Sequence, residues 1–338
     1  MTRSAKGHYH RPVPDASRFH RLDAELARWS RGVLSLNPPV RDADLAALQE
    51  SLGQPVPADY VALLRRFDGA DLRGDRMLSA SESLSEWESM PSALEGAYRG
   101  DPDWAEDGPP RHLLPIATDL EGNLKCLDLA TPGPEVVDWH RETGEITTWH
   151  RDVVAWIMTC VTTIALRFDH RGRPRPIRGR EAETLPLREL RAHLAEDPEG
   201  SYPRMELGRW LSENGTPEEA LFAFREAAVG QPERALCHYL HGRWALIVGR
   251  RDEAKQALRR ALAVPKDPDP KKHTFRSGHL WAAHTLLAAL YDDAQQRRKA
   301  DEQRAAADRA AKRYGSDWYA QSDQYLEALR ALRKGDSE

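Results

Sequence analysis

The chain has 338 residues, of which 40% are hydrophobic and 30% are charged, and its formal net charge is −4. This length corresponds to about two ordinary domains, and this composition excludes a chain that is disordered throughout. The slightly acidic balance excludes a uniformly basic nucleic-acid-binding protein. Three scattered cysteines, Cys126, Cys160 and Cys237, fit neither a disulfide framework nor a zinc knuckle. We therefore expect a cytoplasmic protein.

Neither a secretion signal nor a membrane span is expected. Residues 1–17 combine charge, histidine and proline without an apolar run, which is typical of a disordered arm. The longest apolar stretch, residues 153–166, contains three threonines and is shorter than the roughly 20 residues that cross a bilayer. It predicts a buried helix.

The sign of the charge changes in the middle of the chain. Residues 1–170 contain 18 basic and 27 acidic residues, whereas the remainder contains 31 and 26. The change coincides with residues 171–180, where five arginines alternate with proline and glycine. These arginines are compatible with nucleic-acid binding, but an extended linker is the simpler interpretation. The sequence thus predicts one domain over residues 18–170, a linker over 171–184 and a second domain over 185–338.

The first half is predicted to be an α+β domain, a mixed sheet with flanking helices. Apolar residues at helical spacing predict helices over residues 18–34 and 42–52 and a third beginning at Pro57. Strands separated by turn residues are expected at residues 113–117, 124–129, 136–140 and 146–149. A long helix over residues 152–168 is expected to pack across the sheet.

The second half carries a repeat of 34 residues. Four positions show it: Gly208, Gly215, Ala220 and Ala227 recur as Gly242, Gly249, Ala254 and Ala261. Small residues at these spacings let paired helices approach closely, and the pattern resembles the tetratricopeptide repeat. A fainter third unit follows an insertion around residues 265–272. We predict an all-α domain of tetratricopeptide-like helical repeats, ended by a capping helix over residues 318–332.

The first helix of each predicted pair would line a concave groove. Tyr202, Arg209, Tyr239 and Arg243 fall on these helices. Paired arginines suit the carboxylate groups of a short bound peptide. Solvated groove residues without a dedicated ligand are an equally good interpretation.

The first half resembles the SUKH superfamily of bacterial immunity proteins and fungal glucan-synthesis regulators. The resemblance rests on the order of short motifs from residues 52–60, through Asp68-Gly69 and residues 114–117, to residues 136–140. Members commonly have Asn-Gly-Gly where this chain has Asp68-Gly69-Ala70. The resemblance implies binding rather than catalysis: bacterial members are similar to immunity proteins that bind and block a toxin domain.

An acidic segment over residues 68–110 is the candidate surface for such a partner. It contains eleven acidic residues against three arginines, with aromatic residues between them. Carboxylates around aromatic anchors suit a tight interface with a basic partner. The expected contact residues are Glu86, Trp87, Glu88, Asp101, Asp103, Trp104, Glu106 and Asp107. The alternative is a solvated acidic loop whose tryptophans are buried in the core.

Signatures of catalysis are largely missing from the sequence. It contains no GxSxG, GxxxxGK[ST], GxGxxG or HExxH motif. His238 and His241 lie one helical turn apart without a carboxylate or cysteine at ligand spacing, which favours packed histidines over a metal site. We therefore expect a non-enzymatic protein without cofactor or metal.

Two hypotheses follow. The first is an immunity protein that binds and neutralises a cognate bacterial toxin domain; the second is a scaffold, adaptor or regulatory protein that uses its repeat groove. Both expect protein partners, with a peptide in the groove as a further partner, and neither expects a nucleic acid or a membrane.

Overall fold

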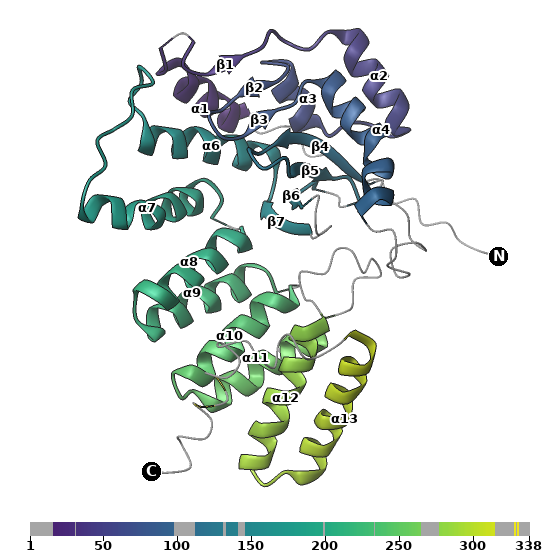
Figure 1. Ribbon diagram of the computed structural model, residues 1–338, viewed down its shortest axis with the longest axis vertical. Coiled ribbons are helices and arrows are strands. Elements are labelled where there is room, and N and C mark those ends of the chain that lie inside the picture. The colour runs from purple at the N-terminus through teal and green to yellow at the C-terminus, as the bar shows by residue number, and fades with distance from the viewer. Residues whose placement is uncertain are drawn as a thin grey trace, which may run out of the picture.

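The structure is a computed structural model with helices and strands arranged along one long axis (Figure 1). It describes residues 16–30, 32–97, 112–130, 133–140, 146–198, 200–232, 234–264 and 277–314, together with residues 328 and 330. The sheet and its helices lie at one end, and a series of helix pairs extends from them toward the other. None of the described helices combines the length and the apolar character that crossing a membrane requires.

In the described residues, seven strands form one sheet in chain order, and every pairing between them is antiparallel rather than mixed. The strands are β1 (Ser35–Leu36), β2 (Ala70–Asp71), β3 (Arg76–Met77), β4 (Leu113–Thr118), β5 (Leu124–Asp128), β6 (Val136–Trp139) and β7 (Ile146–His150). The last four are the strands that the sequence predicts. The first three have two residues each, too few to show an alternating pattern.

Among the described residues, five helices flank this sheet: α1 (Ala16–Ala27), α2 (Asp42–Leu52), α3 (Ala58–Leu64), α4 (Ala80–Ala97) and α6 (Val153–Arg167). Helix α2 ends where predicted, at Gly53, whose φ of 61° is the left-handed conformation that glycine adopts readily. Asp152 caps the start of helix α6, since its side chain accepts a hydrogen bond of 2.8 Å from the backbone N–H of Ala155.

The first helix is shorter than the predicted range of 18–34. The backbone N–H of Ser30 donates to the carbonyl of His170 instead of continuing the helix, and Gly32 turns the chain with a φ of 84°. This turn places Leu34 in the core, at 8% exposure, and allows β1 to pair with β2. The helical spacing of apolar residues in the sequence cannot predict such a tertiary contact.

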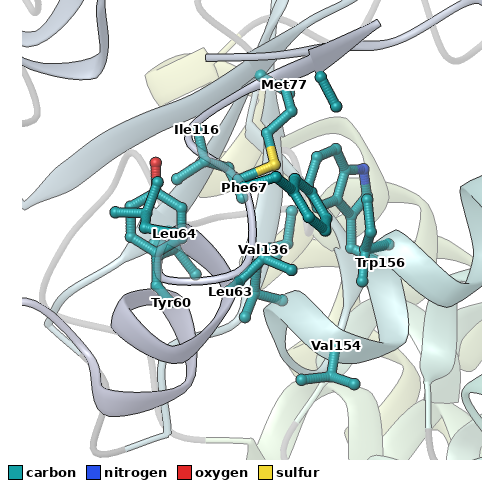
Figure 2. Close-up of a cluster of buried hydrophobic side chains, with 14 of the residues drawn as sticks. Tyr60, Leu63, Leu64, Phe67, Met77, Ile116, Val136, Val154 and Trp156 are labelled. Atoms are coloured by element: carbon teal, nitrogen blue, oxygen red, sulfur yellow. The ribbon is translucent and has the colours of Figure 1, made fainter. Parts of the chain in front are cut away.

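The two faces of the sheet bury separate apolar clusters. On β5, Leu124 and Cys126 pack in a small cluster with Met90 of α4, whereas Leu127 belongs to the main core. Figure 2 shows side chains of α3 and α6 meeting in that main core, Tyr60 and Leu63 on one side and Trp156 on the other. Lys125 shares the face of Leu127 because side chains alternate along a strand.

The second half consists, where described, of helices only: α7 (Arg180–Glu196), α8 (Ser201–Asn214), α9 (Pro217–Gly230), α10 (Ala235–Ile247), α11 (Arg251–Ala263), α12 (Ser277–Asp293) and α13 (Arg297–Tyr314). The pair α8–α9 and the pair α10–α11 begin 34 residues apart, which confirms the predicted helical repeats. Nearly all of the expected capping helix, residues 318–332, lies outside the described residues, as does the insertion around residues 265–272.

The glycines of the repeat lie where paired helices touch. A Cβ atom on Gly208 of α8 would lie 2.7 Å from the ring of Phe224 on α9. A Cβ atom on Gly242 of α10 would lie 2.7 Å from Cγ and 3.1 Å from the backbone nitrogen of Leu258 on α11. Carbon atoms do not pack this closely, so each helix pair requires glycine at this position.

The segment between the two halves folds back on α6. Phe168 bridges to Pro174, and the Asp169 carboxylate accepts hydrogen bonds from the backbone N–H groups of Arg171 and Arg173. Helix α7 starts at Arg180 and packs along α6. The range predicted as linker therefore holds a turn, an extended stretch and the first residues of α7.

Replacing Gly242 with alanine tests the close helix contact. Alanine favours a helix over glycine by about 1 kcal/mol, but overpacking costs about 1–3 kcal/mol, and the contact to the Leu258 backbone leaves little room to adjust. Urea denaturation of Gly242→Ala should show a lower free energy of unfolding. The matched control is Gly74→Ala, whose Cβ would meet no atom within 4 Å. A Gly242→Ala protein as stable as wild type would contradict this packing.

Candidate functional site

The acidic segment predicted to bind a partner is in part helix α4. Glu88 is exposed, and Glu86 is half-buried. Trp87 is also half-buried and packs against the main core, which agrees with the alternative that its ring serves the core. Five further expected contact residues lie outside the described residues: Asp101, Asp103, Trp104, Glu106 and Asp107.

Helix α2 lies beside α4 and adds carboxylates that the sequence analysis did not assign to the surface (Figure 1). Asp42 and Glu50 are exposed on α2. Asp42 pairs with Arg65 at 3.3 Å across an exposed site, an arrangement that contributes little stability. Because α2 and α4 are separated by about thirty residues of sequence, no local pattern joins their charges. We refer to Asp42, Glu50, Glu86 and Glu88, which lie on these two packed helices, as the acidic surface.

The four residues predicted to line the repeat groove do not share one exposed face. Arg209 is exposed and pairs with Glu206 on its own helix at 2.6 Å. Arg243 and Tyr239 are buried, at 6% and 1% exposure, and Tyr202 is half-buried. The guanidinium carbon of Arg243 lies 5.9 Å from the ring centre of Tyr239 and 6.0 Å from that of Trp244. The expected pair of arginines in a groove is therefore not formed, because α10 lies inside the stack and α12 packs against it.

The two histidines of α10 are held by protein groups, as expected for packed histidines. His241 Nε2 lies 2.7 Å from Glu253 Oε1 on the next helix. The sequence analysis did not predict this contact. His238 Nε2 lies 2.9 Å from the carbonyl of Pro232. In the described part of the chain, no three histidine, cysteine, aspartate or glutamate side chains are grouped to hold a metal ion.

A pocket of 260 Å³ opens between the sheet and helices α6 and α7. Its described lining comes from four places: the β2–β3 turn, β5, the end of β7 and one face of α6, with His193 of α7 completing it. The polar and aromatic lining residues are Arg73, Asp75, Lys125, His150, Trp156, Thr159, Cys160, Thr163, Arg167, Phe168 and His193. We refer to it as the Asp75 pocket.

An ion pair lies at the sheet side of this pocket. Lys125 Nζ lies 2.9 Å from Asp138 Oδ2 on the neighbouring strand, and both side chains are nearly buried. Although burial opposes it, attraction by Asp138 and Asp75 raises the pKa of Lys125. For Asp75, burial dominates and raises the pKa of the carboxyl, even though Lys125 attracts it and the Cys160 thiol donates to it at 3.4 Å.

The α7 side of the pocket carries neutral histidines. Burial lowers the pKa of His150 to about 3 and also lowers the pKa of His193. The ring of His193 hydrogen-bonds Thr163 at 3.0 Å, and the two histidine rings lie 6.3 Å apart. His150 Nδ1 lies 3.9 Å from Oδ2 of the buried Asp197. The same oxygen accepts a hydrogen bond of 2.9 Å from the backbone N–H of Arg151.

The pocket brings together cysteine, histidine, aspartate and lysine but not an activated nucleophile. Burial raises the pKa of the Cys160 thiol well above its ordinary value, and its hydrogen bond to Asp75 raises it further. A thiol in this state is protonated and weakly nucleophilic. The arrangement is suited to binding a polar group. Sequence reasoning missed it because Asp75, Lys125 and Cys160 come from three elements spread over 85 residues.

Comparison with known proteins finds a family similar to part of the first half. Residues 39–158, about a third of the chain, match the sequence model of the SMI1 / KNR4 family (SUKH-1). The expected SUKH resemblance of the α+β domain is thereby confirmed over this range. No curated protein matches the chain.

Solved structures resemble part of the chain only in outline. Two of them are described as "Crystal structure of MamA" and "Crystal structure of MamA protein", at 20% and 19% identity, each with a TM-score of 0.30. Each alignment covers 45% of this chain, and they cover 90% and 83% of those proteins.

Burial of His150 predicts a pH-dependent stability. The unfolded histidine titrates near its ordinary pKa of 6.5, whereas the folded one stays neutral down to about 3, so stability falls as the pH drops through this range. The slope is about 1.4 kcal/mol per pH unit, so His150→Gln should lose about 2 kcal/mol less than wild type between about pH 7 and about pH 5. Urea denaturation at both pH values measures this difference. His20→Gln, at an exposed site, is the control and should retain the wild-type dependence.

Proposed function

We propose that this chain is a non-catalytic protein-binding protein whose SUKH domain binds and neutralises a bacterial toxin domain. The observation that carries the proposal is the acidic surface of α2 and α4, located on a domain that matches the SUKH-1 family. The helical repeats support the same general role, because stacked helix pairs present large surfaces to other proteins.

Charge explains why such a surface would suit a toxin. Residues 1–170 carry nine more acidic than basic residues. Many toxin domains that immunity proteins block are nucleases, whose substrate channels are basic. An acidic surface accelerates the encounter with a basic partner and disfavours other acidic proteins. In this proposal Glu86 and Glu88 contact the toxin directly, and residues 101–107 continue the same interface.

One observation favours a second function, a scaffold that acts through the repeats. Phe222 and Val229 are 61% and 69% exposed on α9, and their spacing of seven residues puts them on one side of the helix. Large apolar side chains exposed in line mark surfaces where another protein can pack. A scaffold of this kind would use the outer side of α9 and not the buried arginine of α10.

Charge reversal on α4 separates these functions. A Glu86→Lys, Glu88→Lys double variant should capture the protein encoded next to this chain at least about tenfold more slowly at low salt, because the steering charge is inverted. Surface plasmon resonance with the full-length proteins measures the association rate. The control is Glu302→Lys with Asp308→Lys, an equal charge change at exposed positions of α13.

The result assigns the surface. A slower association rate in the α4 variant but not in the α13 control supports neutralisation through the acidic surface. If the α4 variant binds as wild type does while Phe222→Ser with Val229→Ser loses capture, the scaffold function replaces it.

A further inference from the structure

The described lining of the Asp75 pocket offers more hydrogen-bond donors than acceptors. Three of its side chains, Arg73, Lys125 and Arg167, are cations that only donate, and Asp75 is its one carboxylate. Lys125 and Arg167 form ion pairs with carboxylates outside the lining. Arg73 forms no ion pair within the described residues, so its charge remains for a ligand.

Local contacts hold Arg73 at the opening of the pocket. Its side chain is exposed, and its guanidinium carbon lies 4.6 Å from the ring centre of Phe168, which also lines the pocket. Its Nε donates to the carbonyl of Val33 at 3.3 Å, which leaves the terminal nitrogens Nη1 and Nη2 without an acceptor in the described chain. The φ of Arg73, 57°, is uncommon for a residue other than glycine, and such strain is typical of ligand-binding positions.

Two buried donors of the same lining also lack partners. Trp156 is 1% exposed and Thr159 is 4% exposed, and their spacing of three residues places them on one side of α6. Neither the Trp156 Nε1–H nor the Thr159 hydroxyl has a hydrogen-bond partner in the described chain. Buried polar atoms are normally hydrogen-bonded, so these groups point to a ligand that supplies an acceptor.

The two sets of donors lie far apart in the pocket. Arg73 lies against Phe168, just after the end of α6, and Thr159 comes nine residues earlier in the chain. At 1.5 Å per residue of helix this separation is about 13 Å, so one small ion does not reach both. A ligand that uses both sets is therefore elongated and has an acceptor at each end.

We propose that the Asp75 pocket binds an elongated organic carboxylate that carries a carbonyl group at its other end. The carboxylate pairs with the guanidinium of Arg73 at the opening, through charge-assisted N–H···O bonds. The carbonyl oxygen, which has two lone pairs, accepts from the Thr159 hydroxyl and the Trp156 Nε1–H. The stem between them packs against the ring of Phe168 and the other apolar side chains of the lining. The volume of 260 Å³ accommodates such a stem.

Other ligand classes fit the lining less well. A cation would meet three cations and one carboxylate, and the Cys160 thiol already donates to that carboxylate, Asp75, at 3.4 Å. A metal ion requires several His, Cys, Asp or Glu ligands, and the described residues contain no such group of three. A phosphate dianion requires more than one unpaired cation to compensate for its lost hydration. A carboxylate with a single charge matches the single guanidinium of Arg73.

Calorimetric titration of the full-length protein with 6-acetamidohexanoate tests the site. Two analogues each lack one end of this probe: 6-acetamidohexanamide lacks the charge, and hexanoate lacks the inner carbonyl. The probe should bind at least about tenfold more tightly than 6-acetamidohexanamide, because hydrogen bonds to a charged group are stronger than those to a neutral one. It should bind about fivefold more tightly than hexanoate, which leaves the inner donors without an acceptor.

Two variants test the same contacts from the side of the protein. Arg73→Asn introduces a side chain that tolerates a positive φ; it should weaken binding of 6-acetamidohexanoate by about tenfold and leave binding of 6-acetamidohexanamide unchanged. Thr159→Val should weaken binding of the probe by about fivefold and leave binding of hexanoate unchanged. The matched control is Arg178→Asn, at an exposed arginine outside the described lining, which should bind the probe as wild type does.

The outcomes are distinct. Circular dichroism and thermal unfolding establish that each variant is folded, and Thr159→Val should be no less stable than wild type because the hydroxyl that it removes has no partner in the described chain. No binding of 6-acetamidohexanoate, equal binding of 6-acetamidohexanamide, or unchanged binding of the probe by either folded pocket variant would overturn the proposal.

The same assay distinguishes two sources of the carboxylate. Acetyl-Ala-Ala with a free carboxylate presents the same two ends as the C-terminus of a peptide does. Binding at least as tight as that of 6-acetamidohexanoate identifies the chain end of a protein, and weaker binding identifies a free organic acid. Glu86 and Glu88 do not line the pocket, so failure here leaves the proposed toxin surface unaffected.

Discussion

The relation between the two halves depends on Asp197, a carboxylate with 0% exposure at the end of α7. It accepts a hydrogen bond from the backbone N–H of Arg151, at the start of α6. Gly200 also lies against it, since a Cβ atom there would lie 2.6 Å from Asp197 Oδ2. Burial raises the pKa of this carboxyl, although the backbone N–H and the charge of Arg151 act to lower it. Such a contact is costly to break once formed, because an isolated buried charge remains.

Polar contacts continue along the rest of this junction. Glu196 accepts a hydrogen bond of 2.6 Å from Arg21 of α1. Arg167 of α6 forms an ion pair with Glu189 of α7. Arg234, before α10, reaches Glu135 next to β6 at 2.5 Å. Charged groups need matching geometry to compensate for lost hydration, whereas apolar surfaces tolerate sliding. The junction therefore sets the position of α7, and α7 supplies the His193 side of the Asp75 pocket.

The two halves of the chain use different means to present surfaces. In the repeats, a small residue on one helix faces a large one on the next, which brings α10 inside the stack and buries Arg243 with Tyr239. What remains outside on α9 is apolar at Phe222 and Val229. In the first half the sheet carries apolar clusters on both faces, and the exposed carboxylates lie on α2 and α4. A protein with one acidic and one partly apolar surface is suited to contact other proteins at two separate places.

The sequence by itself determined the elements with long, regular patterns: α2, α6, strands β4–β7 and the 34-residue repeat. These signals are local, since spacing of apolar residues and turn-forming glycines act within one or two elements. It also indicated the acidic character of α4. Only the tertiary structure decided the end of α1, the burial of Arg243 and the meeting of Asp75, Lys125 and Cys160. Those outcomes depend on residues far apart in the chain, whose contacts arise from packing and leave no periodic trace in the sequence.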